Sequence, residues 1–283
     1  MKFTTSRLSV AIARHDAPAN AFVVWRGFED SIVKASLMGY SGIELALHRS
    51  EDIEVDLLDS LLCKYNMAVS SISTGQVFSC SHLYLTSPDP DIRTTAISIL
   101  QDLIHLAAKY NTMVNLGRVR GFRAEGQSFD EVSSLACESL SRLAETAESC
   151  NVDLIIEPIN RYESNFINRL EECAHLISRI GSSKIGIMAD VFHMNIEEVM
   201  IGKALRDNCQ HLKYIHLADS NRLAPGWGHI NFAEIFDALV DIEYRGWLCA
   251  EILPDPTPDA AAAQAAKYLL PWISYLNKSL SIV

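Results

Sequence analysis

Short apolar runs alternate with longer segments of helical character along this chain, at intervals of roughly thirty residues. Four successive runs each end in a side chain that can bind a metal ion. These side chains are Glu157, Asp190, His216 and Glu251. A buried strand followed by an amphipathic helix, repeated at this interval, is typical of a (β/α)8 barrel. The sequence therefore predicts an α/β fold of this barrel type, the TIM barrel.

Eight apolar runs are the predicted strands. They span residues 8–13, 42–47, 68–73, 113–117, 153–157, 185–189, 212–218 and 247–251. Residues 89–110 and 129–150 carry apolar side chains at helical spacing and are predicted helices. Residues 14–27 and 74–87 are longer connections, rich in polar and small side chains, which are expected to lie over the barrel mouth as substrate loops. Because no low-complexity linker interrupts the pattern, residues 1–283 are expected to form a single barrel domain.

Composition and charge agree with an enzyme domain of this kind. With 283 residues, of which 49% are hydrophobic, the chain can bury one large core. Its net charge of −11 disfavours nucleic acid as a partner. The apolar runs are too short for a signal peptide or a membrane helix, so we expect a cytoplasmic protein that does not bind membranes. The seven cysteines form no CxxC pair and are expected to be reduced.

The four strand-end side chains are expected to form one metal site, because the carboxyl ends of the strands in a barrel meet at the same mouth. Alone, an acidic residue after a strand is more often a helix cap or an ion-pair partner, and a lone histidine is more often a core residue. Four such residues on successive strands are poorly explained in that way. Three carboxylates and one imidazole suit Mn²⁺ best, with Mg²⁺ or Co²⁺ as alternatives, rather than a thiolate-rich structural zinc site.

The segments around these residues resemble a known family, the xylose-isomerase-like sugar epimerases and isomerases. Within it, the match is to the D-tagatose 3-epimerase group, and more closely to the 5-keto-L-gluconate epimerase branch. The motifs that carry the resemblance are IIEPINRYESNFIN (155–168), ADVFHMNIEE (189–198), HLADSNR (216–222) and AEILP (250–254), with SISTGQ (71–76), LTSPDPDIR (85–93) and GRVRG (117–121) in the amino-terminal half. The stretch from residue 9 to residue 26 matches least.

The resemblance implies a xylose isomerase-like TIM barrel and a role for each motif residue. The metal ligands that it implies are Glu157, Asp190, His216 and Glu251. It assigns Glu157 and Glu251 a second role, as the catalytic acid and base. It also implies that His193 and Arg222 bind the ketose carbonyl oxygen, and that Glu163 binds nearby substrate hydroxyls.

Two carboxylates suit the inversion of a carbon that lies next to a ketone. One glutamate removes the proton, and a second glutamate on the opposite face of the substrate returns one. The metal ion, His193 and Arg222 would stabilise the enediolate that forms between these steps. This arrangement favours epimerisation over aldose–ketose isomerisation, although a single base can shuttle a proton between adjacent carbons.

Three arginines cluster after the fourth predicted strand: Arg118, Arg120 and Arg123. A sugar carboxylate would bind such cations, and Arg118 and Arg120 are the candidates for it. The alternative is that these arginines pair with nearby glutamates or with a neighbouring subunit. Gln76 is a candidate ligand for a substrate hydroxyl, or else it satisfies backbone groups of its own loop. Glu44 and His48 could also face the mouth but are expected to be structural.

These observations favour a metal-dependent sugar epimerase acting on a keto-sugar acid, with 5-keto-L-gluconate and D-tagaturonate as the preferred pair. Within the same class, the alternatives are a ketose 3-epimerase of the tagatose, allulose or ribulose type and a hydroxypyruvate-type isomerase. An endonuclease IV-like DNA-repair hydrolase is the distant alternative, but it would need a trinuclear zinc cluster and a basic DNA-binding face. A non-catalytic sugar-binding or inositol-pathway accessory protein would not need the acid and base. The apolar C-terminal helix expected at 260–280 could support a homo-oligomer, either a dimer or a tetramer.

Overall fold

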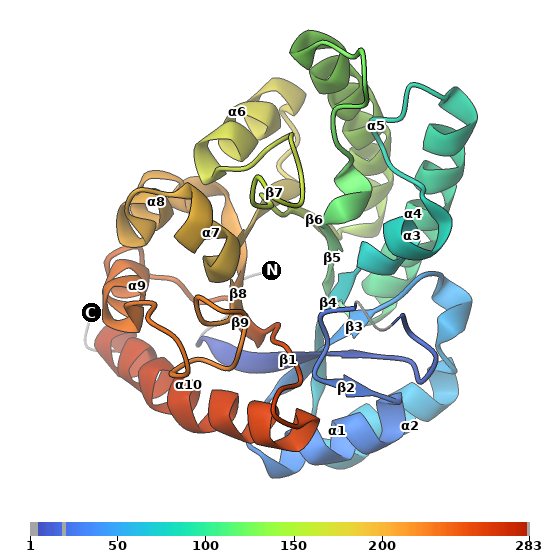
Figure 1. Cartoon of the computed structure of the whole chain (residues 1–283). Coiled ribbons are helices and arrows are strands. Elements are labelled where there is room, and N and C mark those ends of the chain that lie inside the picture. The colour runs from blue at the N-terminus through green and yellow to red at the C-terminus, as the bar shows by residue number, and fades with distance from the viewer. Residues whose placement is uncertain (1–4, 19–20, 282–283) are drawn as a thin grey trace.

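Eight parallel strands close into a barrel in this computed structural model, which describes residues 5–18 and 21–281 (Figure 1). Each strand pairs with its neighbours in chain order, and β9 pairs with β1 to complete the circle. The barrel strands are β1 (Arg7–Ala13), β3 (Gly42–Ala46), β4 (Ala68–Ser73), β5 (Met113–Leu116), β6 (Asp153–Ile156), β7 (Ile185–Asp190), β8 (Leu212–Leu217) and β9 (Trp247–Ala250). The predicted TIM barrel is therefore confirmed.

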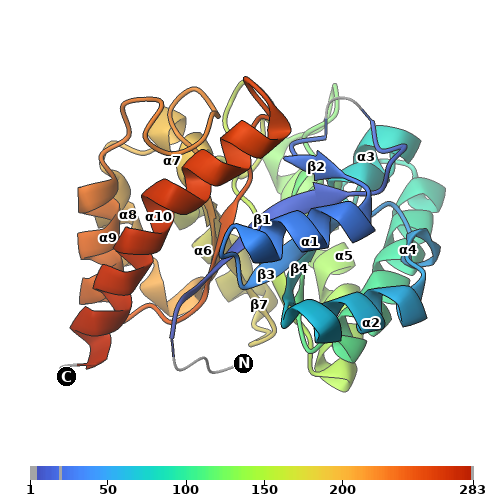
Figure 2. The same cartoon turned by 90° about the horizontal axis from the view of Figure 1, so that it is seen from below.

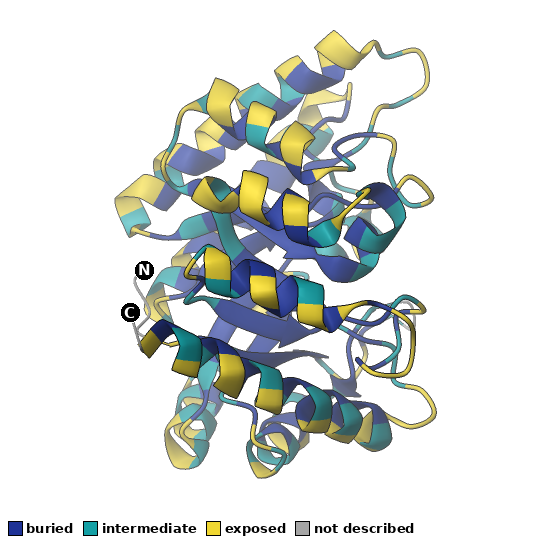
Figure 3. Ribbon diagram, turned by 90° about the vertical axis from the view of Figure 1, so that its left-hand side faces the viewer, coloured by how far each residue is buried: buried dark blue, intermediate teal, exposed yellow. Residues whose placement is uncertain are grey.

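Helices surround the barrel, with their apolar sides against the strands and their polar sides outward (Figure 3). The longer ones are α1 (Phe28–Leu37), α2 (Val55–Tyr65), α4 (Pro90–Lys109), α5 (Phe129–Cys150), α6 (Leu170–Ile180), α9 (Phe232–Asp241) and α10 (Pro258–Ser281). The shorter helices and 3-10 turns are α3 (Gly75–Ser81), α7 (Val191–Glu197), α8 (Ile201–Asp207), η1 (Ser50–Asp52), η2 (Arg118–Arg120) and η3 (Cys209–His211). Capping residues stabilise the first turn of two of these helices. Ser128 and Glu131 form a capping box at α5, and Asp89 caps α4 just before Pro90.

The two long connections contain more regular structure than the sequence indicates. Residues 75–81 form the short helix α3, and Trp25 and Arg26 form β2, which pairs with β1. Seven residues are too few to show a helical period, and α3 is held by the burial of Val77, which is a tertiary effect. In Figure 2 α3 lies at the same end of the barrel as α7, which is the end where the site lies.

Side chains fill the inside of the barrel below its mouth. Ala11, Met113, Ile155, Met188 and Tyr214 belong to one buried cluster that is separate from the larger core between strands and helices. Along β8, the side chains of Tyr214 and His216 point to the same side because strand side chains alternate. Thus Tyr214 packs in the filled interior, and His216 sits one layer higher, at the mouth.

The C-terminal helix α10 packs on its own barrel. Its buried residues include Ala261, Ala265, Leu269 and Leu276, and it contacts β1 and α9. The apolar character of this helix is thus accounted for within one chain, and a homo-oligomer stays a prediction. Among the residues described, no helix combines the length and the apolar composition that crossing a bilayer requires.

Candidate metal centre and active site

The four predicted metal ligands lie together at the carboxyl ends of neighbouring strands. Asp190 ends β7 and pairs in register with His216 on β8, while Glu157 and Glu251 directly follow β6 and β9. One potential ligand atom from each side chain lies within 4.8 Å of those of the other three. Glu251 is partly exposed and the other three are buried. The closed barrel therefore brings together residues as far apart in the sequence as Glu157 and Glu251.

Two buried polar atoms in this cluster have no hydrogen-bond partner: Asp190 Oδ2 and His216 Nδ1. The nearest carboxylate oxygens to His216 Nδ1 are 3.5 Å away on Glu251 and 3.9 Å away on Asp190. Leaving such atoms unsatisfied costs about 1–3 kcal/mol each, and a cation between them would satisfy both. Carboxylate oxygens with a single imidazole are a donor set that fits Mn²⁺, Mg²⁺ or Co²⁺. The residues present thus fit the predicted divalent ion.

Glu44 fixes the orientation of the ligand histidine. Its carboxylate oxygens lie 3.0 and 3.1 Å from His216 Nε2, and both side chains are fully buried. Because a carboxylate accepts, Nε2 carries a proton, and Nδ1 is the atom that faces the cluster. Carboxylates commonly orient metal-binding histidines in this way. The sequence indicated only a structural role for Glu44, since it precedes His216 by 172 residues and only the closed barrel makes them neighbours.

The carboxylates of the cluster perturb one another. Burial, and then the charge of Glu251, raises the pKa of Glu157 to about 8. Burial likewise raises the pKa of Asp190 to about 6. Burial would also raise the pKa of Glu251, but His216 and Arg222 together lower it to about 2. The pKa values of Glu157 and Glu251, the two residues proposed as acid and base, are therefore shifted in opposite directions, as is typical of such pairs.

Arg222 is held over the cluster in a strained backbone conformation. Its φ is 60°, a value that costs a residue with a side chain roughly 1–3 kcal/mol. The loop maintains it through Asp219, which accepts the Arg222 amide with its carbonyl oxygen and several loop amides with its carboxylate. The guanidinium lies 3.8 Å from the Phe22 ring centroid and 4.7 Å from that of Phe192, and donates to Glu251 Oε2 at 2.5 Å. The Arg222 N–H groups are thus directed at the site.

His193 and Glu163 complete the predicted substrate-binding group around the cluster. His193 Nε2 lies 3.6 Å from Glu157 Oε1, and burial, followed by the charge of Arg222, holds the pKa of His193 well below its usual value. Glu163 Oε2 lies 3.3 Å from Arg118 Nη2, and Glu163 Oε1 lies 3.7 Å from Arg222 Nη1. A neutral imidazole, an arginine and a carboxylate therefore surround the same space.

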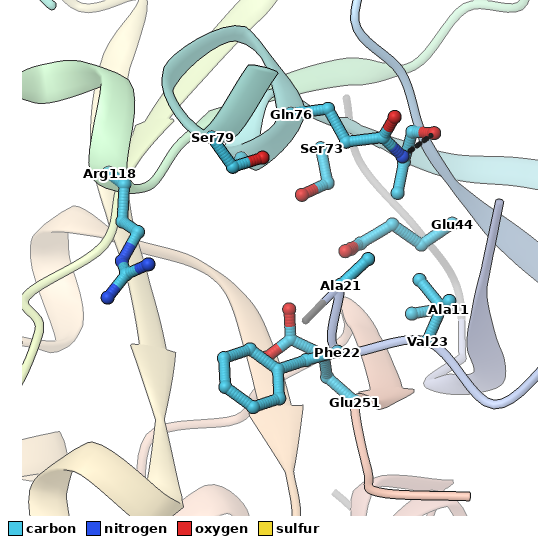
Figure 4. A pocket seen from close by; sticks show the side chains of 12 residues that line it. Ala11, Ala21, Phe22, Val23, Glu44, Ser73, Gln76, Ser79, Arg118 and Glu251 are labelled. Atoms are coloured by element: carbon cyan, nitrogen blue, oxygen red, sulfur yellow. Dashed lines mark hydrogen bonds between the residues drawn. The ribbon is translucent and has the colours of Figure 1, made fainter. Parts of the chain in front are cut away.

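A cavity opens beside the cluster, with Glu251 and Glu44 at one end (Figure 4). It encloses about 520 Å³, a figure that includes the part open to solvent. Its polar side chains include Ser73, Ser79 and Arg118, and Figure 4 shows Arg118 extending into it from the side opposite Glu44. Apart from Gln76, the remaining lining is small or apolar: Ala11, Ala21, Phe22, Val23, Ala46 and Gly75.

The three clustered arginines have separate positions. Arg120 is buried, and its guanidinium donates to the carbonyl oxygens of Glu157 and Gly121 at 2.8 Å and of Ile167 at 3.0 Å. It supports the loop that follows β6, so its predicted role in substrate binding is not supported. Arg123 is exposed and does not line the cavity, which leaves Arg118 as the arginine that a substrate could reach.

Gln76 lines the same cavity from α3, and its amide nitrogen already donates a hydrogen bond within the protein. Its Nε2 donates to the Ala46 carbonyl oxygen at 2.9 Å (Figure 4), and the side chain is buried. This contact is the backbone role that the sequence left open as the alternative to substrate binding. Gln76 joins α3 to the end of β3 and thereby fixes one side of the cavity.

Comparisons with known proteins show which family the chain resembles. Residues 32–272 match the family model described as xylose isomerase-like TIM barrel. The D-psicose 3-epimerase of Ruminiclostridium cellulolyticum is 31% identical over 229 residues, which cover 78% of this chain and 76% of that protein. The 3-dehydro-D-guloside 4-epimerase of Escherichia coli is 33% identical over 125 residues, or 44% of this chain and 48% of that one. In fold, an L-ribulose 3-epimerase structure superposes with a TM-score of 0.82, over 98% of each chain and at 24% identity.

Replacement of Glu44 is expected to weaken metal binding. Both E44Q and E44A remove the charged acceptor of His216 Nε2, and loss of such a support typically lowers metal affinity by about 10–100-fold. Titration calorimetry with Mn²⁺ measures the effect. The matched control is E138Q, at an exposed position on α5, which should bind like the parent. Parental affinity in both Glu44 variants would show that His216 needs no such support.

Proposed function

Because the chain belongs to the xylose isomerase-like TIM barrel family, we propose that it is a metal-dependent epimerase that inverts a carbon next to a ketone in a sugar. The predicted family resemblance is confirmed, and the named relatives make the chain a carbohydrate isomerase. The observation that carries the proposal is the meeting of Glu157 and Glu251 with Asp190 and His216 in one cluster beside a cavity.

Glu157 and Glu251 are proposed as the two proton-transfer groups. One glutamate takes the proton from the carbon beside the ketone, and the other delivers a proton to the opposite face. Burial and the charge of Glu251 raise the pKa of Glu157, whereas His216 and Arg222 lower that of Glu251, so the two carboxyl groups differ in environment. A divalent ion held by Glu157, Asp190, His216 and Glu251 would supply positive charge that favours the enediolate over the ketone.

His193 and Arg222 are proposed to bind the oxygen on which negative charge develops. Arg222 is buried, donates a hydrogen bond to Glu251 and packs against the Phe22 ring. Its hydrogen bonds therefore form where little water competes. His193 Nε2 lies 3.6 Å from Glu157 Oε1 and 3.4 Å from Arg222 Nη1. Glu163 is proposed to accept hydrogen bonds from substrate hydroxyls.

We infer a keto-sugar acid as the substrate, with 5-keto-L-gluconate and D-tagaturonate as the interconverted pair and Mn²⁺ as the metal. Two observations support a carboxylated substrate: the motif resemblance and Arg118, which lines the cavity and lies 3.3 Å from Glu163 Oε2. A charge-assisted hydrogen bond from Arg118 would bind the carboxylate while the ketone end reaches the cluster. The named relatives that act on psicose favour neutral ketoses as the second candidate substrates.

The proposed activity is tested by NMR of the protein with a panel of keto-sugars and keto-sugar acids in D₂O. We expect conversion of one epimer to the other, with deuterium entering at the inverted carbon. Treatment with a chelator should abolish conversion, and Mn²⁺, Co²⁺ or Mg²⁺ should restore it. Undiminished turnover by exhaustively metal-free protein would exclude the proposed mechanism.

Replacing Arg118 separates the two substrate classes. R118Q should lower kcat/KM for a keto-sugar acid by roughly 1.5–3 kcal/mol in transition-state free energy, the usual contribution of a charged hydrogen bond. Neutral ketoses should be turned over almost as before. R123Q is the matched control, because Arg123 lies in the same loop but outside the cavity. Equal losses on acid and neutral substrates would count against a carboxylate at Arg118.

Replacing either glutamate tests the two-base mechanism. E157Q and E251Q keep the side-chain size but remove the proton-transfer group, so each should lower kcat by about 10²–10⁴-fold. Each variant keeps one base and should exchange deuterium into one epimer without inverting it, and the two variants should act on opposite epimers. Metal binding by both variants is measured in parallel. If both variants label the same epimer, a single base serves both faces and the mechanism is wrong.

A further inference from the structure

A buried asparagine, Asn160, sits between the loop after β6 and the side chain of His193. Its Oδ1 accepts the Tyr162 backbone N–H at 3.0 Å, and its Nδ2 donates to Glu163 Oε1 at 3.2 Å. These two contacts fix which end of the amide is the oxygen, since the opposite orientation would set donor against donor and acceptor against acceptor. The Nδ2 group of Asn160 then faces His193 Nδ1 at 2.7 Å.

This contact determines which ring nitrogen of His193 carries the proton. An amide NH₂ can only donate, so at 2.7 Å His193 Nδ1 must accept, and it can hold no proton. A neutral imidazole has one donor and one acceptor, so the proton is on Nε2. Around Nε2 lie the acceptors Glu157 Oε1 at 3.6 Å and Asp190 Oδ2 at 3.8 Å. Arg222 Nη1, which can only donate, also lies 3.4 Å from Nε2; this contact is longer and therefore weaker than the 2.7 Å contact at Nδ1, which decides the tautomer.

We propose that Asn160 is a positioning residue that holds His193 as the Nε2–H tautomer, so that the ring donates a hydrogen bond to the substrate oxygen at the metal cluster. The catalytic use of this donor rests on the proposed epimerase function. The tautomer itself does not, because it follows from contacts within the chain. No proton is transferred in this role: the N–H bond stays intact, and the hydrogen bond strengthens as the oxygen gains charge.

The tautomer can be read directly by NMR. Protein labelled with ¹⁵N in histidine and loaded with diamagnetic Mg²⁺ gives long-range ¹H–¹⁵N correlations for each ring, and loss of one set of peaks in H193Q assigns His193. We expect a pyrrole-like Nε2 and a pyridine-like Nδ1. A protonated Nδ1 in the parent protein would overturn the proposal, whether or not any sugar is turned over.

Asn160 variants test whether the tautomer matters. N160D replaces the donor with an acceptor, so His193 should move its proton to Nδ1, and kcat should fall by on the order of 100-fold, the effect of losing one oxyanion donor, with little change in KM. N165D is the matched control: it adds the same charge to the same loop, away from His193, and should keep the parental spectrum and kcat. A parental ring spectrum in N160D would contradict the proposal, as would parental kcat despite a switched tautomer.

Thermal melting separates this role from a purely structural one. The Asn160 side chain also bonds the Tyr162 amide and Glu163 within its loop, so N160D and N160A can lower stability. A purely structural role predicts lost stability and an unchanged His193 spectrum in the folded fraction. A changed spectrum in protein that remains folded supports positioning. If N160D does not fold, the spectrum of the parent decides alone.

Discussion

The site depends on the neutralisation of negative charge that the barrel concentrates in a buried place. Glu157, Asp190 and Glu251 converge within a few ångströms, and two like charges about 4 Å apart repel by about 4 kcal/mol at the effective dielectric of a protein surface. Arg222 offsets part of this repulsion at Glu251, and His216 Nδ1 lies between Asp190 and Glu251. A divalent ion at the unsatisfied atoms would complete the balance. The pKa values of the two glutamates diverge for a different reason, since burial and neighbouring carboxylates raise that of Glu157 whereas His216 and Arg222 lower that of Glu251.

Local sequence predicted most of the fold and the members of the cluster. Each barrel strand is a short apolar run, and each ligand stands at or directly after the last residues of one, so strand ends and ligands could be located together. The helix α3 could not be predicted in this way, because it spans seven residues and is fixed by the burial of Val77. The predicted substrate-binding role of Arg120 fails for a related reason. Its charge suggested an anion, whereas the folded loop surrounds it with carbonyl oxygens.

The residues that support the site were the least predictable. Glu44 comes 172 positions before His216, and Asn160 comes 33 positions before His193. No periodicity or motif spacing links the members of either pair. Their roles follow from the direction of hydrogen bonds across the barrel mouth, and only the folded structure shows that direction. A sequence can therefore indicate which side chains meet a metal or substrate long before it indicates what orients them.

The two histidines of the site illustrate how that orientation works. Glu44 can only accept, so it accepts a hydrogen bond from His216 Nε2 and leaves Nδ1 free to bind the proposed metal ion. Asn160 faces His193 with its donor end, so the proton of that ring must stay on Nε2, the nitrogen that points at the cluster. The choice of an amide at position 160 has an electrostatic reason as well. A carboxylate there would add charge beside Glu163 and reverse the His193 tautomer, whereas the neutral amide directs the ring without adding to the negative charge that the site already has to balance.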